Sequence, residues 1–439
     1  MHSCHQAPIV ARLPSAVNRP VQYAPIVTTD LILIDAGAVL DPRTGAVTEG
    51  RSLVVRNGRI EAVLEPGATR PDPGSVHRID LAGLTVLPGL IDTHAHLIGA
   101  LEFAGIPSIH ETAESELAAG EANAKATLHA GVTSVRDVGS YRGFLDVELR
   151  RRISEGRVSG PRMQCAGAMI TKPRGGGEVT GDPDVDIPPE FRVGVVNDPD
   201  EMRATVGRLV AGGADVIKLI VTGAVLTRGT KVDDVELDAP MIEAAVARAT
   251  ELGVFVAAHA HGARGIRIAA ESGVRSVEHA SLIDDDGIAA MVAHGTWMVA
   301  DVYDGDWIAE VGLRDGWPAE TLAKNTATTE AQRAGFSRAL AAGVRMAFGT
   351  DSGVYPHAFV ARQFPIMVRL GMSPLGLIRA ATVDAAEMMG WSESVGTLDV
   401  GGFADLIGVV GDPTADVQCL ADPAVVIKGG IVVRDDRPG

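Results

Sequence analysis

Short apolar segments at both ends of the chain differ in pattern from the long middle section. Four of them are rich in Leu, Ile and Val: residues 30–40, 51–63, 404–410 and 425–433. Asn57-Gly58 and Gly429-Gly430 interrupt these segments at two places, and such pairs are typical of β-hairpin turns. Both ends of the chain therefore predict short strands joined by tight turns.

Strands at the two termini predict one small β-sandwich domain built from both chain ends. We expect this domain to comprise residues 25–86 and 393–439. Residues 1–24 have no clear pattern and are expected to form a loose N-terminal tail. Residues 87–392 then form a second, larger domain.

In this middle section, apolar segments of strand length alternate with Ala-rich segments that often end in Gly, as helices do. Eight strand-like segments are found: residues 84–94, 132–137, 162–169, 214–221, 254–259, 276–279, 296–302 and 344–350. Eight β-then-α units in about 300 residues are the count and size of a TIM barrel, (β/α)8. A doubly wound sheet is the alternative, but the Gly-rich phosphate loop that would favour it is absent after the first strand. The sequence therefore predicts the α/β class, with a TIM barrel over residues 87–392.

One connection within the predicted barrel is unusually long and rich in Gly and Pro. It covers residues 171–198 and begins just after the third strand. Long loops at the C-terminal ends of barrel strands shape active sites. The segment is therefore either a lid over such a site or a plain surface excursion.

Composition and charge narrow the class of protein. The 439 residues are 46% hydrophobic, which is ample for a large core, and the formal net charge is -17. An acidic protein repels phosphate backbones, so nucleic acid is not the expected partner. Only three cysteines are present, without a CxxC pair, which suits a cytoplasmic location. No apolar segment approaches the roughly 20 residues of a membrane span, so no membrane partner is expected either.

Side chains that bind metals fall at the ends of several predicted strands, where barrel active sites lie. His94 and His96 are two residues apart, so a strand places both rings on one face, toward the barrel axis. His259, His279 and Asp351 add two nitrogens and a carboxylate at the same end. Such a set suits zinc or another divalent transition metal with an open position for water. A lone histidine at a strand end is more often structural, so the prediction depends on the coincidence of all five.

These residues lie in motifs that resemble those of the amidohydrolase superfamily. The resemblance begins with Leu87-Pro88-Gly89-Leu90-Ile91-Asp92-Thr93-His94-Ala95-His96 and continues through residues 131–137, the Lys218 strand, the His259 and His279 strands, and residues 349–353. Residues 401–406 resemble the closing segment of the family. The resemblance thus covers nearly the whole chain.

The resemblance implies a site with two divalent metal ions, and zinc is the expected metal. His94, His96 and Asp351 would bind the more buried ion, and His259 and His279 would hold the second. Lys218 would be N-carboxylated and bridge the two ions; without the resemblance it would be interpreted as a snorkelling lysine or an ion-pair partner. Asp351 would be the catalytic residue, accepting a proton from the attacking water and passing it to the leaving nitrogen.

Within the superfamily, residues 256–262 and 276–279 resemble the prolidase-like and imidazolonepropionase-like branch, which includes Xaa-Pro dipeptidases and ochratoxin amidases. By this resemblance His259 is the ligand and His261 lies nearer the substrate, although the reverse assignment stays open. His357 also resembles a pocket position.

The loop after the third strand departs from this branch, because residues 172–178 lack the histidine that many relatives carry there. Arg228 and Lys231 could bind a substrate carboxylate, or they are ordinary solvated charges. Tyr303 is a further candidate for a hydrogen bond to the substrate, and a rim tyrosine without a role is the alternative.

The predicted function is metal-dependent hydrolysis of an amide bond in a small molecule, such as a dipeptide, an N-acyl amino acid or an aryl amide. The alternative is hydrolysis of a cyclic amide, a carbamate or a lactone on the same binuclear site, because fold and metals set the reaction type while loops set the substrate. A binding protein without catalysis is disfavoured, since none of the six expected ligands is missing. By the same resemblance we expect a homo-oligomer.

Overall fold

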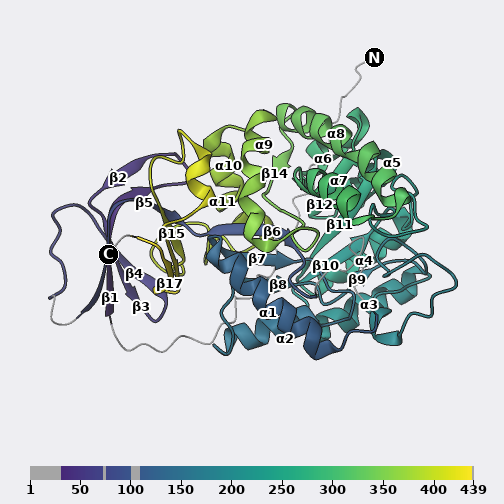
Figure 1. Cartoon of the computed structure of the whole chain (residues 1–439), viewed down its shortest axis with the longest axis horizontal. Coiled ribbons are helices and arrows are strands. Elements are labelled where there is room, and N and C mark those ends of the chain that lie inside the picture. Colours follow the sequence, from purple (N-terminus) through teal and green to yellow (C-terminus); the bar gives the residue numbers. More distant parts are fainter. Residues whose placement is uncertain (1–30, 73–75, 100–108, 438–439) are drawn as a thin grey trace, which may run out of the picture.

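A computed structural model describes residues 31–72, 76–99 and 109–437 of the chain. The predicted tail over residues 1–24 lies outside this range. Figure 1 shows two parts side by side, a β-rich domain formed by both ends of the chain and a larger α/β domain formed by the middle. Of the helices described, none combines the length and apolar character needed to cross a bilayer.

The smaller domain is the predicted β-sandwich, and its strands form one continuous eight-stranded sheet. The order along the sheet is β17-β16-β15-β5-β1-β3-β4, with β2 paired to β1. Its strands are β1 (Leu31–Leu40), β2 (Val47–Glu49), β3 (Ser52–Arg56), β4 (Arg59–Leu64), β5 (Val76–Pro88), β15 (Leu406–Val409), β16 (Val425–Lys428) and β17 (Ile431–Asp435).

Both predicted hairpin turns of this domain are present. Asn57 and Gly58 join β3 to β4, and Gly429 and Gly430 join β16 to β17, each pair with positive φ. Two consecutive positive φ values match a type I′ turn, which Asn-Gly and Gly-Gly adopt at little cost. Most apolar side chains of the sheet pack into a core of their own, whereas Leu40, Leu87, Ile407, Val409 and Val426 pack into the core of the larger domain.

The larger domain is the predicted TIM barrel, and all of its strand pairs are parallel. β8 and β9 together occupy the third position, and β6 meets the segment after β14 through hydrogen bonds such as Thr93 N to Phe348 O. The barrel strands are β6 (Leu90–Ala95), β7 (Val132–Asp137), β8 (Arg162–Cys165), β9 (Met169–Ile170), β10 (Val216–Ile220), β11 (Phe255–Gly262), β12 (Ser276–Leu282), β13 (Trp297–Val299) and β14 (Arg345–Met346).

Helices follow the barrel strands and pack around them (Figure 1). Asp198 caps the third helix and Asp238 the fourth, each followed by Pro within the first two helical positions. The helices are α1 (Ala113–His129), α2 (Leu145–Ser154), α3 (Pro199–Ala211), α4 (Ala239–Glu251), α5 (Ala263–Glu271), α6 (Asp285–His294), α7 (Asp304–Asp315), α8 (Ala319–Ala341), α9 (Phe364–Arg369), α10 (Pro374–Ala380) and α11 (Val383–Met389).

Two predicted elements are divided differently in the structure. The strand-like segment 84–94 is shared between β5 of the sandwich and β6 of the barrel, with Gly89 between them. The helix-like residues 373–389 form two short helices, because Thr382 leaves the helical region at φ -139° and ψ -95°. Apolar periodicity continues across both breaks, so composition alone does not reveal them.

A buried ion pair fastens the sandwich to the barrel. Arg162 of β8 donates two hydrogen bonds to Asp405, at 2.6 and 2.9 Å, and both side chains are about 4% exposed. The amide of Gly429 donates a third bond to Asp405, and the guanidinium of Arg162 lies 3.4 Å from the ring centre of Phe403. Each charge at this junction is therefore compensated by a partner.

Candidate metal centre

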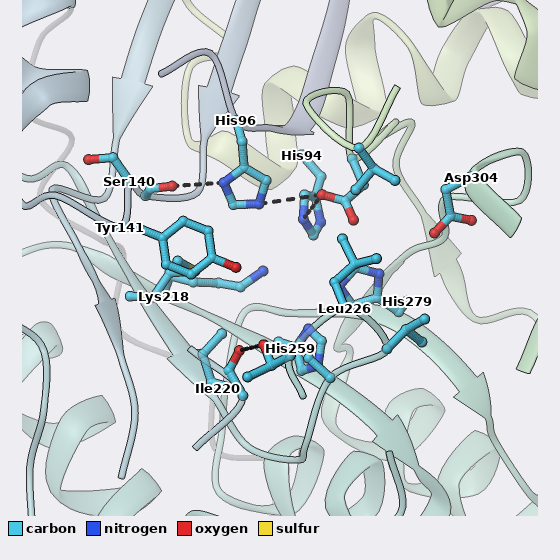
Figure 2. Close-up of a pocket in the computed structure, with 18 of the residues that line it drawn as sticks. His94, His96, Ser140, Tyr141, Lys218, Ile220, Leu226, His259, His279 and Asp304 are labelled. Carbon is cyan, nitrogen blue, oxygen red and sulfur yellow. Dashed lines mark hydrogen bonds and ion pairs between the residues drawn. The ribbon is translucent and has the colours of Figure 1, made fainter. Parts of the chain in front are cut away.

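Seven polar side chains predicted at the site meet in one cavity at the C-terminal ends of the barrel strands. Figure 2 shows the imidazoles of His94 and His96 above the cavity, Lys218 crossing it, and His259 and His279 below. The cavity measures about 940 Å³, part of it open to solvent. The residues that meet there are His94 and His96 from β6 and its end, Lys218 from β10, His259 and His261 from β11, His279 from β12, and Asp351 after β14.

The backbone around Asp351 is held in an unusual conformation. Asp351 has φ 55° and His279 has φ 68°, which are values that residues other than Gly seldom adopt and that cluster at functional sites. Gly349 lies so close to the first strand that a Cβ there would come within 2.8 Å of His94 Cβ. A glycine at this position therefore lets the last strand bring Asp351 beside His94 and His96.

His94, His96 and Asp351 bring three ligand atoms together, Nε2 of each ring and Oδ1 of the carboxylate. When both rings are neutral, none of these three atoms carries a proton. His94 Nδ1 lies 2.9 Å from Glu278 Oε2, and His96 Nδ1 lies 2.7 Å from the carbonyl oxygen of Gly139. Both acceptors require the proton on Nδ1, so each neutral ring presents a bare Nε2. Both Nε2 atoms lie 3.4 Å from Asp351 Oδ1.

Each of these two separations suits a pair of ligand atoms on one cation, and His94, His279 and Asp351 also offer ligand atoms that lie within 4.8 Å of one another. Ligand atoms at about 2.1 Å around a tetrahedral ion are separated by about 3.4 Å. Within residues 31–72, 76–99 and 109–437, His94 Nε2 has no hydrogen-bond partner although it is fully buried. Buried polar atoms are normally satisfied, so the arrangement suits a metal ion at this point.

A second group of three histidines lies directly beside the first. The ring centres of His259, His261 and His279 are 4.5 to 4.8 Å apart, and the ring of His94 lies 4.9 Å from that of His279. His279 Nδ1 lies 2.9 Å from Asp301 Oδ2, which directs its Nε2 to the cavity. One ligand atom from each of these three rings lies within 4.8 Å of the others, as a bound metal ion requires.

The structure offers both β11 histidines to this second position. His259 Nε2 is 3.3 Å from the carbonyl oxygen of Gly223, which leaves its Nδ1 for a ligand. His261 Nδ1 is 2.8 Å from Ser281 Oγ, which leaves its Nε2. Both assignments, with His259 or His261 as the metal ligand, therefore stay open.

Lys218 lies between the two groups, and its amine is buried and without a hydrogen-bond partner in the part of the chain described. Burial lowers the pKa of Lys218 to about 8. A neutral, unpaired amine is the form that reacts with carbon dioxide, so the residue fits the expected carboxylation. The donor set of nitrogens and carboxylates also fits zinc.

The electrostatics of Asp351 keep its carboxyl group ionised. Burial raises the pKa of this carboxyl group, but the adjacent His94 and His96 outweigh burial and hold the pKa well below its usual range. Asp351 is therefore ionised at neutral pH.

A further layer of residues positions the ligands. Arg136 donates to both oxygens of Glu278, at 2.9 and 3.0 Å, and so fixes the carboxylate that contacts His94. Asp301 holds His279 in the same way and accepts a bond from Gln332 Nε2 at 3.0 Å. Hydrogen bonds of this kind fix ring orientation and tautomer at metal sites.

Four residues predicted near the substrate do not line the cavity. Arg228 and Lys231 are exposed. Tyr303 is buried, accepts a hydrogen bond from Arg362 at 2.7 Å and packs against Tyr355. His357 is buried behind the site, with Nδ1 3.2 Å from Thr127 Oγ1.

Residues 171–198 form part of the cavity wall, where Gly176 lines the cavity. Thr227 donates to the carbonyl of Gly176 at 2.7 Å, and Gly181 donates to the carbonyl of Arg228. Val179, Ile187 and Phe191 form a small apolar core within the segment. It therefore packs as an ordered wall against residues 222–236.

Four further residues at the site were not predicted from the sequence. Asp301 and Asp304 follow the seventh strand, and a carboxylate at a strand end is the signal that could have identified them. Tyr141 and Glu116 also line the cavity, but neither lies in a motif that distinguishes it from a surface residue. Tyr141 extends its hydroxyl into the cavity beside Lys218 (Figure 2).

Comparisons with known proteins agree with this fold and site. A sequence model of the amidohydrolase family matches residues 85–433, and the chain belongs to this family. The chain is a hydrolase that acts on C–N bonds, in the prolidase-like and ochratoxinase-like branch of the family.

Individual relatives cover nearly the whole chain. A solved structure described as a Xaa-Pro dipeptidase with bound methionine in the active site is 33% identical, with a TM-score of 0.84, over 92% of this chain and 99% of that one. Ochratoxinase of Aspergillus niger is 27% identical over 95% of this chain and 90% of its own. Imidazolonepropionase of Chromobacterium violaceum is 27% identical over 84% of this chain and 88% of its own.

Proposed function

We propose that this amidohydrolase cleaves an amide bond of a small molecule at a centre of two zinc ions. His94, His96 and Asp351 would hold one ion, His259 and His279 the other, and N-carboxylated Lys218 would bridge them. The observation that carries the proposal is that Nε2 of His94 and Nε2 of His96 each lie 3.4 Å from Asp351 Oδ1, beside the buried amine of Lys218, which has no hydrogen-bond partner among the described residues.

The chemistry follows from what each part supplies. Bound divalent ions lower the pKa of a water molecule and polarise a carbonyl group. Asp351, ionised and 3.4 Å from two ring nitrogens, accepts the proton that the attacking water loses as its oxygen bonds to the carbonyl carbon. The same carboxyl group then gives this proton to the leaving nitrogen when the C–N bond breaks.

The remaining residues hold this arrangement. Glu278 and Asp301 keep the protons of His94 and His279 on Nδ1, which leaves Nε2 of each ring free for a ligand. Tyr141 places a hydroxyl at the cavity, where it could donate a hydrogen bond to a substrate oxygen.

A substrate panel with and without chelator tests the proposal. Metal-loaded protein would be mixed with dipeptides, N-acyl amino acids, aryl amides, carbamates and lactones. We expect cleavage of amides that a chelator abolishes and that zinc restores. Amide cleavage that persists in fully metal-free protein contradicts the proposal, as does cleavage confined to carbamates or lactones.

Two further proposals concern the state of the protein in the cell. Assembly into a homo-oligomer and a cytoplasmic location stay predictions from the sequence and the resemblance. Light scattering of the purified protein tests the first, and cell fractionation tests the second.

A further inference from the structure

The cavity wall beyond the metal-binding residues is mainly apolar. Aliphatic and thioether side chains come from strands, a helix and loops around the site, and Leu226 lies at the cavity beside His279 in Figure 2. They include Ile98, Met169, Ile220, Leu226, Ile308 and Val354. Such a wall favours apolar groups on the substrate through burial of their surface.

Cationic side chains are missing from this wall. Among the residues that line the described cavity, Lys218 is the one lysine and arginine is absent. Arg142 lies behind Glu116, but its guanidinium is occupied: it bonds Glu116 at 2.7 Å, Glu190 at 2.8 Å and the carbonyl of Glu111 at 2.8 Å. Arg228, the sequence candidate for a carboxylate, is on the surface.

Two backbone amides at the wall are occupied by other partners. The amide of Gly176 donates to Glu236 at 2.8 Å, and that of Ala224 donates to Thr230 Oγ1 at 3.2 Å. The wall also carries two carboxyl groups of its own, Glu116 and Asp304. A substrate carboxylate would therefore be buried at this wall without an ion-pair partner, which is costly.

We propose that this site selects amides that carry no carboxylate, with uncharged, largely apolar groups on both sides of the scissile bond. The inference rests on the amide hydrolysis proposed above and defines its substrate class. It separates this chain from the dipeptidase to which it is similar, because a dipeptide and the methionine bound to that relative both carry a carboxylate.

Matched pairs of amides test the inference. On the leaving side, the pair is the hexanoyl amides of para-aminophenylacetate and para-aminophenylacetone, in which a methylene keeps the changed group from altering the reactivity of the amine. On the acyl side, the pair is succinyl anilide and levulinoyl anilide. We expect kcat/KM of the neutral member to exceed that of the carboxylate by about 10-fold to 100-fold in both pairs, the cost of an unpaired buried charge.

Variants at Leu226 provide a second test of this selectivity. Leu226→Arg places a guanidinium on the wall and should raise the carboxylate-to-neutral ratio of kcat/KM at least about 10-fold, the scale of a charge-assisted hydrogen bond. Leu226→Gln is the matched control, polar and uncharged, and should leave the ratio unchanged. The wild-type comparison decides the question if the arginine variant does not fold.

The outcomes separate this inference from the proposed function. Equal or faster cleavage of the carboxylate member in either pair overturns the inference and leaves amide hydrolysis standing. Absence of chelator-sensitive cleavage of all four amides contradicts the proposed function, and the inference falls with it.

Discussion

The molecule has two buried clusters of polar side chains, one at the junction of the domains and one at the barrel mouth. They differ in whether their polar atoms have hydrogen-bond partners. At the junction of sandwich and barrel, Arg162 and Asp405 satisfy one another and Asp405 accepts a further bond from Gly429. At the barrel mouth, His94 Nε2 and Lys218 Nζ are equally buried but have no hydrogen-bond partner among the described residues. Since an unsatisfied buried group is costly, the second cluster is organised for a ligand and the first for stability.

The largest expected effect is on catalysis at the barrel mouth. Asp351→Asn removes the proton acceptor, so we expect kcat to fall about 10²-fold to 10⁴-fold. Steady-state kinetics together with metal analysis measure this loss. Asp286→Asn changes an exposed carboxylate on α6 and should keep full activity. Full activity of Asp351→Asn with its metals still bound contradicts the role given to Asp351.

Substitution at the junction of the two domains should lower the stability of the protein and leave its catalytic rate unchanged. Arg162→Met removes the guanidinium that donates two hydrogen bonds to the buried Asp405 carboxylate, and we expect a loss of about 3–5 kcal/mol in the free energy of unfolding. Denaturant titration measures the loss, and kcat per folded molecule should be unchanged. Arg314→Met breaks an exposed pair on α7 and should have no measurable effect. An unchanged stability for Arg162→Met would show that the junction is not a structural clamp.

A smaller effect on metal affinity or activity is expected from substitution of Asp301, whose carboxylate orients the metal-binding His279. Asp301→Asn keeps the shape of the side chain but removes the charge that holds the proton on His279 Nδ1. We expect metal affinity or activity to fall about 10-fold to 100-fold, with the fold intact. Metal titration and kinetics measure both quantities. If neither changes, His279 does not depend on Asp301 for its orientation.

The architecture was predictable because its signals are local. Asn57-Gly58 and Gly429-Gly430 specify their turns through backbone conformation alone, and both turns are present. The alternation of strand-like and helix-like segments gave the barrel. The pattern did not show where β5 ends and β6 begins, because both strands are apolar and only Gly89 lies between them.

The site was predictable where the strand itself directs the side chain. His94 and His96 share a face because strand periodicity requires it, and the structure places both at the cavity. Strand periodicity does not fix the direction of side chains on loops, so their positions were not predictable in this way. Thr227 bonds Gly176, and Lys324 donates to the carbonyl of Thr227, so this loop turns the next residue, Arg228, to the surface. These contacts join residues far apart in the sequence.

Titration of metal-free protein with zinc tests the central claim most directly. The account predicts that amide hydrolysis rises with metal content and reaches its plateau at two ions per chain. Lys218→Met, which cannot be carboxylated, should not reach that plateau. Full hydrolysis by metal-free protein, or a Lys218→Met variant with wild-type metal content and activity, would contradict the account.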